Sequence, residues 1–133
     1  MTKDQLKAYR SIDLERRRLL LMIEELEATM TNPRSQQLDG MPRAGSAPGS
    51  VLENLIIKRA DLVEKYREKV LELTEATEKI EKAIEGLEPR ERTLIRLHYI
   101  QGLTWEEVCV AMNYSWRQIH RIHGAALALL KNT

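Results

Sequence analysis

The chain has 133 residues, and its 21 Lys/Arg against 20 Asp/Glu give a formal net charge of +1. Charged residues make up 31% and aromatic residues 5%, which is typical of helix-rich proteins with much surface and a small core. The near-neutral charge excludes a polybasic protein, and the single Cys excludes an internal disulfide. The longest apolar run, residues 19–23, is too short for a membrane span. With no recognisable secretion signal, a cytoplasmic protein without a membrane partner is expected.

The first element expected is a helix over residues 3–30. Thr2 with Gln5 has the form of a capping box, and apolar residues recur at helical spacing as far as Met30. Asn32-Pro33 then ends the pattern. Residues 16–18 are three consecutive arginines. They form either a solvated face paired with nearby carboxylates or a phosphate contact, and the first reading is favoured because helical charge runs usually do only this.

Residues 31–49 contain the Pro-, Gly- and Ser-rich part of the chain, so we predict a loop there. Its arginines Arg34 and Arg43 leave two readings open, a hairpin tip or a binding loop. Ser50 with Glu53 has the form of another capping box, and the longest helix is expected over residues 51–85.

The long helix carries a heptad-like apolar seam. Its members are Ile56, Arg59, Val63, Tyr66, Val70, Leu73, Thr77, Ile80, Ile84 and Leu87. The first helix can fold back on the first half of this seam as an antiparallel hairpin, which gives a helical segment over residues 1–86. The remainder, residues 73–87, needs another partner. A second copy, making a homodimer through the long helices, is the economical answer, and packing of the terminal segment is the competing one.

Three shorter helices are expected over residues 87–133. Gly86 ends the long helix, and Pro89 suits a first helical turn. Thr104 with Glu107 and Ser115 with Gln118 then form two capping boxes eleven positions apart. Asn113 between them tolerates the left-handed backbone of a tight turn. Helices over residues 105–112 and 116–130 joined in this way make a helix-turn-helix, so the predicted fold is all-α.

The second helix of this motif has an apolar and a polar face. Val108, Cys109 and Met112 of the first helix face Ile119 and Ile122 of the second. Since the first turns of the second helix enter the major groove in a helix-turn-helix, Arg and Gln there can contact bases or phosphates. The candidate DNA-binding residues are Ser115, Trp116, Arg117, Gln118, His120, Arg121, Arg90, Arg92 and Thr104. Arg96 is a further candidate for phosphate or polymerase contact.

Other chemistry has weak support. His120 and His123 have a spacing that metal ligands can adopt, but no Asp or Glu lies near them. We therefore expect no metal, with His120 facing DNA and His123 at the edge of the domain. Cys109 falls on an apolar face, as a small buried residue would. No nucleophile motif, phosphate loop or carboxylate pair is present, so no cofactor and no enzymatic activity are expected.

Residues 87–130 resemble region 4 of bacterial sigma-70-type factors, the domain that reads the −35 promoter element. The resemblance lies in Pro89-Arg90-Glu91-Arg92, residues 94–97, Tyr99, Gly102-Leu103-Thr104, Glu106-Glu107-Val108, residues 115–122 and Ala126-Leu127. Region 4 usually has Arg-Glu-Arg-Val-Arg-Gln-Ile after its serine, whereas this chain has Trp at 116 and His at 120. The −35 specificity is therefore not implied. The layout of the whole chain, with Gly-Met-Pro-Arg at residues 40–43, is similar to small phage late-gene regulators of the ArpU and RinA type.

Three functions follow from these patterns. The first is a sequence-specific DNA-binding transcription regulator of phage or prophage origin, acting on double-stranded DNA in a bacterial host. The second is an adaptor that binds RNA polymerase or another protein with little DNA contact. The third is a small terminase-like subunit that recognises phage DNA. Oligomer size separates the third from the others, since terminases form large rings, and duplex affinity separates the first from the second.

Overall fold

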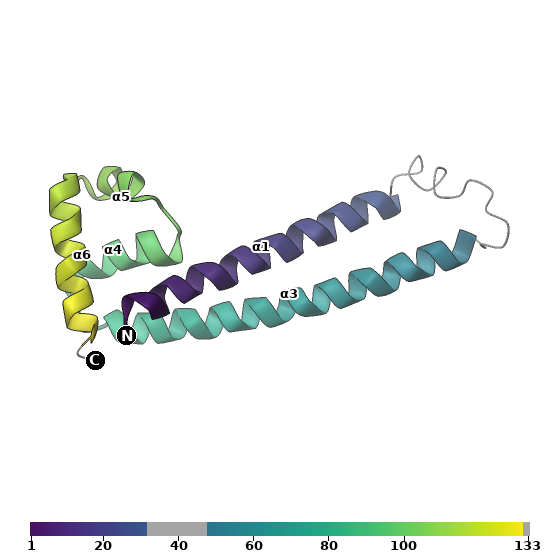
Figure 1. Ribbon diagram of the computed structural model, residues 1–133, viewed down its shortest axis with the longest axis horizontal. Coiled ribbons are helices and arrows are strands. Elements are labelled where there is room, and N and C mark those ends of the chain that lie inside the picture. The colour runs from purple at the N-terminus through teal and green to yellow at the C-terminus, as the bar shows by residue number, and fades with distance from the viewer. Residues whose placement is uncertain (32–47, 132–133) are drawn as a thin grey trace. The chain divides into compact units, whose positions relative to one another are not determined.

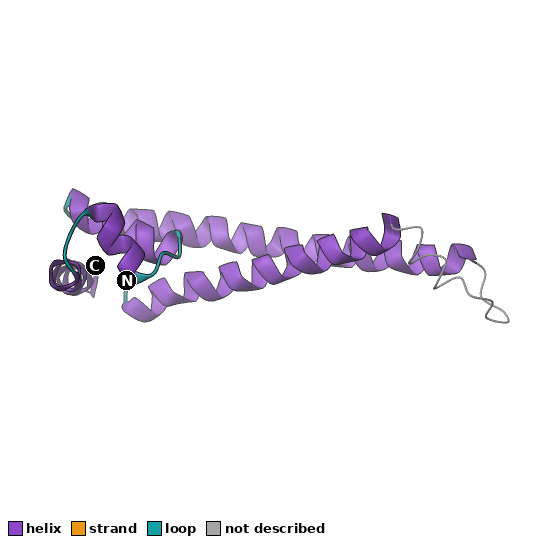
Figure 2. Cartoon of the chain, turned by 90° about the horizontal axis from the view of Figure 1, so that it is seen from above, coloured by secondary structure: helices purple, strands orange, loops and turns teal. Residues whose placement is uncertain are grey.

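The computed structural model describes residues 1–31 and 48–131 of the chain. Its elements are α1 (Lys3–Thr31), α3 (Pro48–Ile84), α4 (Pro89–Ile95), η1 (Arg96–Ile100), α5 (Trp105–Met112) and α6 (Trp116–Lys131). The described residues contain helices and turns without a strand (Figure 2), so the all-α prediction is confirmed. The predicted loop over residues 31–49, with Arg34 and Arg43, lies almost wholly outside the described residues.

The two long helices follow the predicted spans with small shifts. α3 begins at Pro48, so Ser50 lies inside its first turn and the predicted cap at Ser50 is wrong. A proline is favoured at the first position of a helix because its fixed φ is already helical. α3 ends at Ile84, two residues before Gly86. At the other long helix, Thr2 and Gln5 exchange the two hydrogen bonds of a capping box, at 2.8 and 3.4 Å.

The described residues form two compact units, Leu14–Leu71 and Met1–Asp13 with Glu72–Thr133. Each unit contains a part of both long helices. The division into domains at residues 86 and 87 was made on sequence pattern, a different criterion from compactness, and it stays a prediction.

In the unit Leu14–Leu71, α1 and α3 lie side by side and run in opposite directions (Figure 1). Ion pairs join Glu15 to Lys69 and Glu27 to Arg59, both at 2.8 Å. Arg16, of the arginine cluster, donates a hydrogen bond to the Tyr66 hydroxyl at 3.3 Å. These contacts place the start of one helical segment level with the end of the other, as in the predicted antiparallel hairpin.

The predicted seam of α3 is only partly confirmed within this unit. The seam residues Arg59 and Tyr66 contact α1. Ile56 and Val70 are instead 51% and 39% exposed, whereas Leu62, outside the predicted seam, is buried. A straight helix has 3.6 residues per turn, so a strict seven-residue repeat drifts around its surface and only some of its positions face α1.

The other unit has a continuous apolar core built from α1, α3 and the terminal helices. Its buried members are Leu6, Ile80, Ile84, Leu87, Leu94, Ile95, Tyr99, Val108, Ile119, Ile122, Ala126 and Leu130. The main-chain ammonium of Met1 also donates to the Leu130 carbonyl oxygen at 2.8 Å. The end of the α3 seam is thus covered by the terminal helices of the same chain, as in the competing interpretation. The covered end of the seam therefore supplies no reason to place a second copy at residues 73–87.

Candidate nucleic-acid interface

The segment leading into the helix-turn-helix changes helical form before it turns. α4 starts with Pro89 and continues into the single π turn η1, where the Gln101 N–H donates to the Arg96 carbonyl oxygen at 2.9 Å. Gly102 then has φ +76°, a left-handed conformation that glycine adopts at little cost. This reversal brings the chain to Thr104 and α5.

Both predicted capping boxes are confirmed. The Thr104 hydroxyl oxygen accepts from the Glu107 N–H, and the Glu107 carboxylate accepts from the Thr104 N–H, both at 3.2 Å. Ser115 and Gln118 repeat this exchange at the start of α6, at 3.2 and 2.9 Å. Two orphan N–H groups of each helix are thereby satisfied.

The turn between α5 and α6 is closed by Asn113. Its φ of 56° and ψ of 44° are left-handed, and its N–H donates to carbonyl oxygens at the end of α5. Tyr114, half-buried, packs against the core, and its N–H donates to the Cys109 carbonyl oxygen at 3.1 Å. The predicted turn is confirmed, and α5 and α6 form a helix-turn-helix.

α6 is buried along one face and exposed along the other. Ile119, Ile122, His123, Ala126 and Leu130 are buried. On the other side, Arg117, Gln118 and Arg121 are exposed and Trp116 is 52% exposed. The exposed side continues as the small residues Gly124, Ala125 and Ala128, and the long side chains of Leu129 and Lys131 are exposed again in the last turn. The polar side chains for recognition are therefore concentrated in the first two turns of the helix.

His120 does not project with these residues. Its ring lies between two indoles, with ring centroids 5.1 Å from Trp105 and 4.5 Å from Trp116. Its Nε2 atom is buried and has no hydrogen-bond partner among the described residues. Trp105 in turn stacks on His98 at a centroid distance of 3.7 Å. His120 thus packs against the indole of Trp116, and direct contact of His120 with DNA stays a prediction.

His123 is buried, and its predicted place at the domain edge is wrong. Its Nε2 atom lies 2.6 Å from the Tyr99 hydroxyl oxygen. Burial, together with the nearby charges of Lys3, His98 and His120, lowers the pKa of His123 to about 4. Burial also raises the pKa of Tyr99 to about 12. At neutral pH the Tyr99 hydroxyl and the His123 imidazole are therefore both uncharged, and they share one hydrogen bond whose direction is set by the tautomer of the imidazole.

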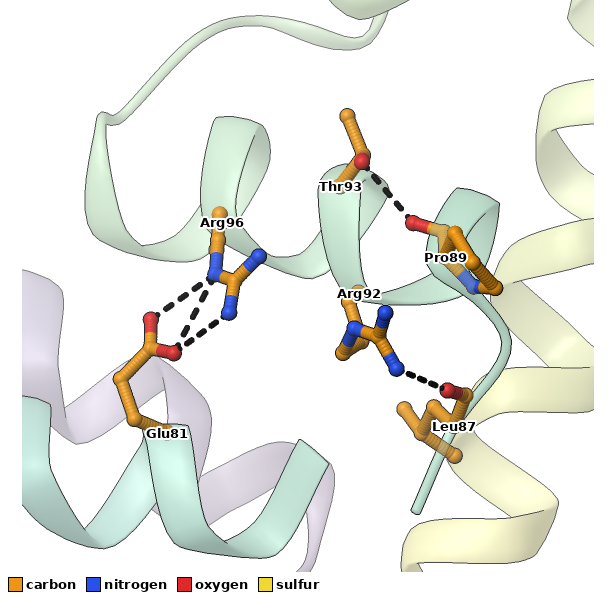
Figure 3. Close-up of polar contacts among 6 residues, drawn as sticks. All are labelled: Glu81, Leu87, Pro89, Arg92, Thr93 and Arg96. Atoms are coloured by element: carbon orange, nitrogen blue, oxygen red, sulfur yellow. Dashed lines mark hydrogen bonds and ion pairs between the residues drawn. The ribbon is translucent and has the colours of Figure 1, made fainter. Parts of the chain in front are cut away.

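The three arginines of α4 and η1 have different surroundings, and Figure 3 shows two of them, Arg92 and Arg96. Arg96 pairs with the Glu81 carboxylate through its Nε and Nη2 atoms at 2.9 and 2.6 Å. The hydrogen bond from Arg96 lowers the pKa of Glu81. Arg92 donates to the Leu87 carbonyl oxygen at 2.7 Å. Arg90 is exposed, 3.4 Å from the Glu88 carboxylate. Arg92 and Arg96 thus hold the turn after α3 in place, whereas Arg90 is the exposed one of the three.

The sequence patterns did not predict several tertiary contacts around the helix-turn-helix. The Tyr99–His123 hydrogen bond, the stack of His98 on Trp105 and the Arg96–Glu81 pair join residues far apart in sequence. Glu91 is also buried, and its Oε2 atom lacks a hydrogen-bond partner in the described part of the chain. The only signal available was that all three histidines occur after residue 87.

Other classes of site find no support in the described residues. Across residues 1–31 and 48–131, no group of three or more His, Cys, Asp or Glu residues could hold a metal ion. Cys109 is a half-buried free thiol packed against the core. No helix in the described ranges is long and apolar enough to cross a membrane.

The geometry agrees with a comparison against known families. The model of the family described as Sigma-70, region 4, matches residues 83–132. This match confirms the resemblance seen in the sequence and extends it back into the last residues of α3. Comparisons with curated proteins and with solved structures found no match.

Proposed function

From the sigma-70 region 4 domain, a DNA-binding helix-turn-helix, at residues 83–132, we propose that the chain is a sequence-specific transcription regulator. It reads the major groove of double-stranded DNA with the first two turns of α6. The observation that carries this proposal is the exposure of Trp116, Arg117, Gln118 and Arg121 on one side of a helix whose other side is buried. In this motif that end of the second helix enters the groove.

The exposed side chains can contact different groups in the major groove. Arg117 and Arg121 lie four residues apart on α6, so both can reach the same stretch of groove. Each can take a guanine edge with two hydrogen bonds. The Oε1 atom of Gln118 accepts from the Ser115 N–H, and its amide NH₂ group can donate to a base edge. Trp116 offers an apolar surface to a thymine methyl group.

Phosphate contacts can come from the helix caps and from Arg90. The hydroxyl oxygens of Thr104 and Ser115 accept from main-chain N–H groups, which leaves each hydroxyl proton available to a phosphate oxygen. Both residues are exposed, as is Arg90. Contacts of this kind set the register of the protein on the duplex without reading bases.

The finer features of the regulator also belong to the proposal. We propose a phage-type regulator that acts as a homodimer through its long helices, contacts RNA polymerase and catalyses no reaction. The combination of a region 4 domain with a long helical hairpin supports the phage type, and the resemblance to region 4 supports the polymerase contact. An operator read by two copies would be a pseudo-palindrome, because protein symmetry is mirrored in the site.

The test begins with selection of bound duplexes from a randomised pool. Fluorescence anisotropy then compares the selected duplex with a scrambled one at low and physiological salt. Arg121→Ala should weaken binding to the selected duplex about 5- to 150-fold, the equivalent of ~1–3 kcal/mol. Lys131→Ala is the matched control, because it removes one positive charge from the exposed last turn of the same helix. It should change affinity by less than about threefold.

The outcomes separate the proposed function from its alternatives. Selective binding that Arg121→Ala weakens and high salt reduces supports groove reading. Absence of duplex binding at both salt concentrations would refute the regulator and favour the polymerase or protein adaptor. Selective binding by a large ring would instead favour the terminase-like subunit.

A further inference from the structure

The unit Leu14–Leu71 exposes seven large apolar side chains to solvent. Leu14, Leu21, Leu52, Ile56, Ile57, Val70 and Leu71 are between 39% and 61% exposed. Only Ile23 and Leu62 are buried apolar residues among the described residues of this unit. Two helices packed along one seam cannot cover their outer faces, and exposed apolar surface of this extent marks an interaction site.

One edge of this hairpin is marked by the ion pair between Glu27 and Arg59. On each helix, the next residues outward from this edge are those at i−3 and i+4. They are Glu24 on α1, and Ile56 and Val63 on α3. In an antiparallel pair, the i−3 and i+4 positions of both helices are rotated towards the same side of the pair. Glu24, Ile56 and Val63 therefore lie on the same side of the hairpin.

The exposed face of α1 has a charge pattern that reverses about Leu21. Helical spacing places Leu14, Arg17, Arg18, Leu21, Glu24, Glu25 and Ala28 on this face, and all seven are exposed. The two arginines precede Leu21 by three and four residues, and the two glutamates follow it by three and four. The apolar residues Leu14 and Ala28 lie seven residues to either side.

This pattern is complementary to itself when a second copy runs in the opposite direction. Leu21 then meets Leu21 of the partner subunit, and Leu14 meets Ala28 of the partner subunit. Arg18 lies opposite Glu24 of the partner subunit, and Arg17 lies opposite Glu25 of the partner subunit. Each pair occurs twice, as an isologous two-fold interface requires.

We propose that this face of α1 is the interface of a two-fold homodimer in which the α1 helices pack antiparallel about Leu21. The described residues of the unit hold eight Lys/Arg and eight Asp/Glu, so no net charge opposes association of two copies. A parallel arrangement would place arginine against arginine, which is destabilising. The same alternation disfavours a nucleic acid as the occupant, because Glu24 and Glu25 would face phosphates.

The interface deepens the proposed function, since it rests on the dimer proposed there and names its surface. It makes no use of α6, and its test is run without DNA. Failure to bind DNA would therefore leave the result for the dimer unchanged. If the protein proves monomeric, the anisotropy measurement still tests DNA recognition by a single copy of the domain.

The test uses two charge-reversed variants of the full chain and sedimentation velocity. Arg17→Glu/Arg18→Glu carries four glutamates on the face, and Glu24→Arg/Glu25→Arg carries four arginines. Each variant alone should dimerise at least tenfold more weakly than the wild type. An equimolar mixture should form a 1:1 heterodimer, because each arginine of one variant then meets a glutamate of the other. Lys79→Glu/Lys82→Glu changes the net charge equally at exposed positions of α3 outside the face, and should dimerise like the wild type.

Circular dichroism at 222 nm shows that each variant is helical before its oligomeric state is compared. Recovery of the dimer only in the mixture supports the interface, since a general loss of folding would not be repaired by mixing. A monomeric wild type, a dimer that both charge-reversed variants retain, or a mixture that stays monomeric would overturn it. An assembly larger than a dimer would do the same.

Discussion

Acid should destabilise the DNA-binding unit through His123. This imidazole is buried beside Tyr99, and burial lowers its pKa to about 4, whereas an unfolded histidine has a pKa of about 6.5. The folded state therefore binds fewer protons than the unfolded state between these two values. Stability is complete above about pH 6.5, falls as the pH drops below it and levels off below about pH 4.

The size of the effect follows from the two pKa values. The full difference of about 2.5 units corresponds to about 3.4 kcal/mol, since one unit is worth 1.36 kcal/mol. Between pH 7.5 and pH 5 the same pKa values give a loss of about 2 kcal/mol in the free energy of unfolding. Burial also lowers the pKa of His98, which adds a contribution of the same sign.

The matched variant is Tyr99→Phe/His123→Leu, which removes both partners and leaves neither polar atom unsatisfied. Urea unfolding followed by circular dichroism at 222 nm, at pH 7.5, 6 and 5, measures the free energy of unfolding. The double variant should lose about 2 kcal/mol less than the wild type over this range. Equal losses in the two proteins would refute the burial of an uncharged His123 as the source of acid sensitivity.

Three further predictions concern the local structure around the helix-turn-helix. Asn113→Gly should leave thermal stability nearly unchanged, while Asn113→Ala should cost about 1–2 kcal/mol because its backbone is left-handed; equal effects would contradict this reasoning. Thr104→Ala should cost about 1 kcal/mol by removing the acceptor of the Glu107 N–H, and a change below about 0.3 kcal/mol in urea unfolding would argue against the cap. A double-mutant cycle on Glu81 and Arg96, whose side chains are 39% and 43% exposed, should give a coupling of about 1 kcal/mol or less. A coupling above about 3 kcal/mol would contradict that value.

The local signals in the sequence predicted the helix-turn-helix closely. Capping boxes act over three residues and a left-handed turn over one, so Thr104, Asn113 and Ser115 could be interpreted without knowledge of the fold. Outward placement of Arg117, Gln118 and Arg121 followed from helical period alone. These parts of the site depend on neighbours in the chain.

The remaining features depend on partners distant in sequence. His123 and His120 occupy positions that helical period leaves ambiguous, and their surroundings are decided by Tyr99 and Trp105 on other helices. The α3 seam was predicted only in part, because a strict heptad drifts around a straight helix and the pattern does not reveal which of its positions meet α1. Leu62 was buried instead of Ile56.

The hydrogen bond between Met1 and Leu130 joins residues 129 positions apart, which has a consequence for folding during synthesis. Leu6 is made early, yet most of the core that covers it belongs to residues 80–130. The packing around the N-terminal turn of α1 can therefore be completed only after α6 has left the ribosome. Closing so long a loop adds only a slowly growing entropic cost, about 0.6 kcal/mol per doubling, but contacts of high sequence separation form slowly. The hairpin can fold first, and α6 is packed last.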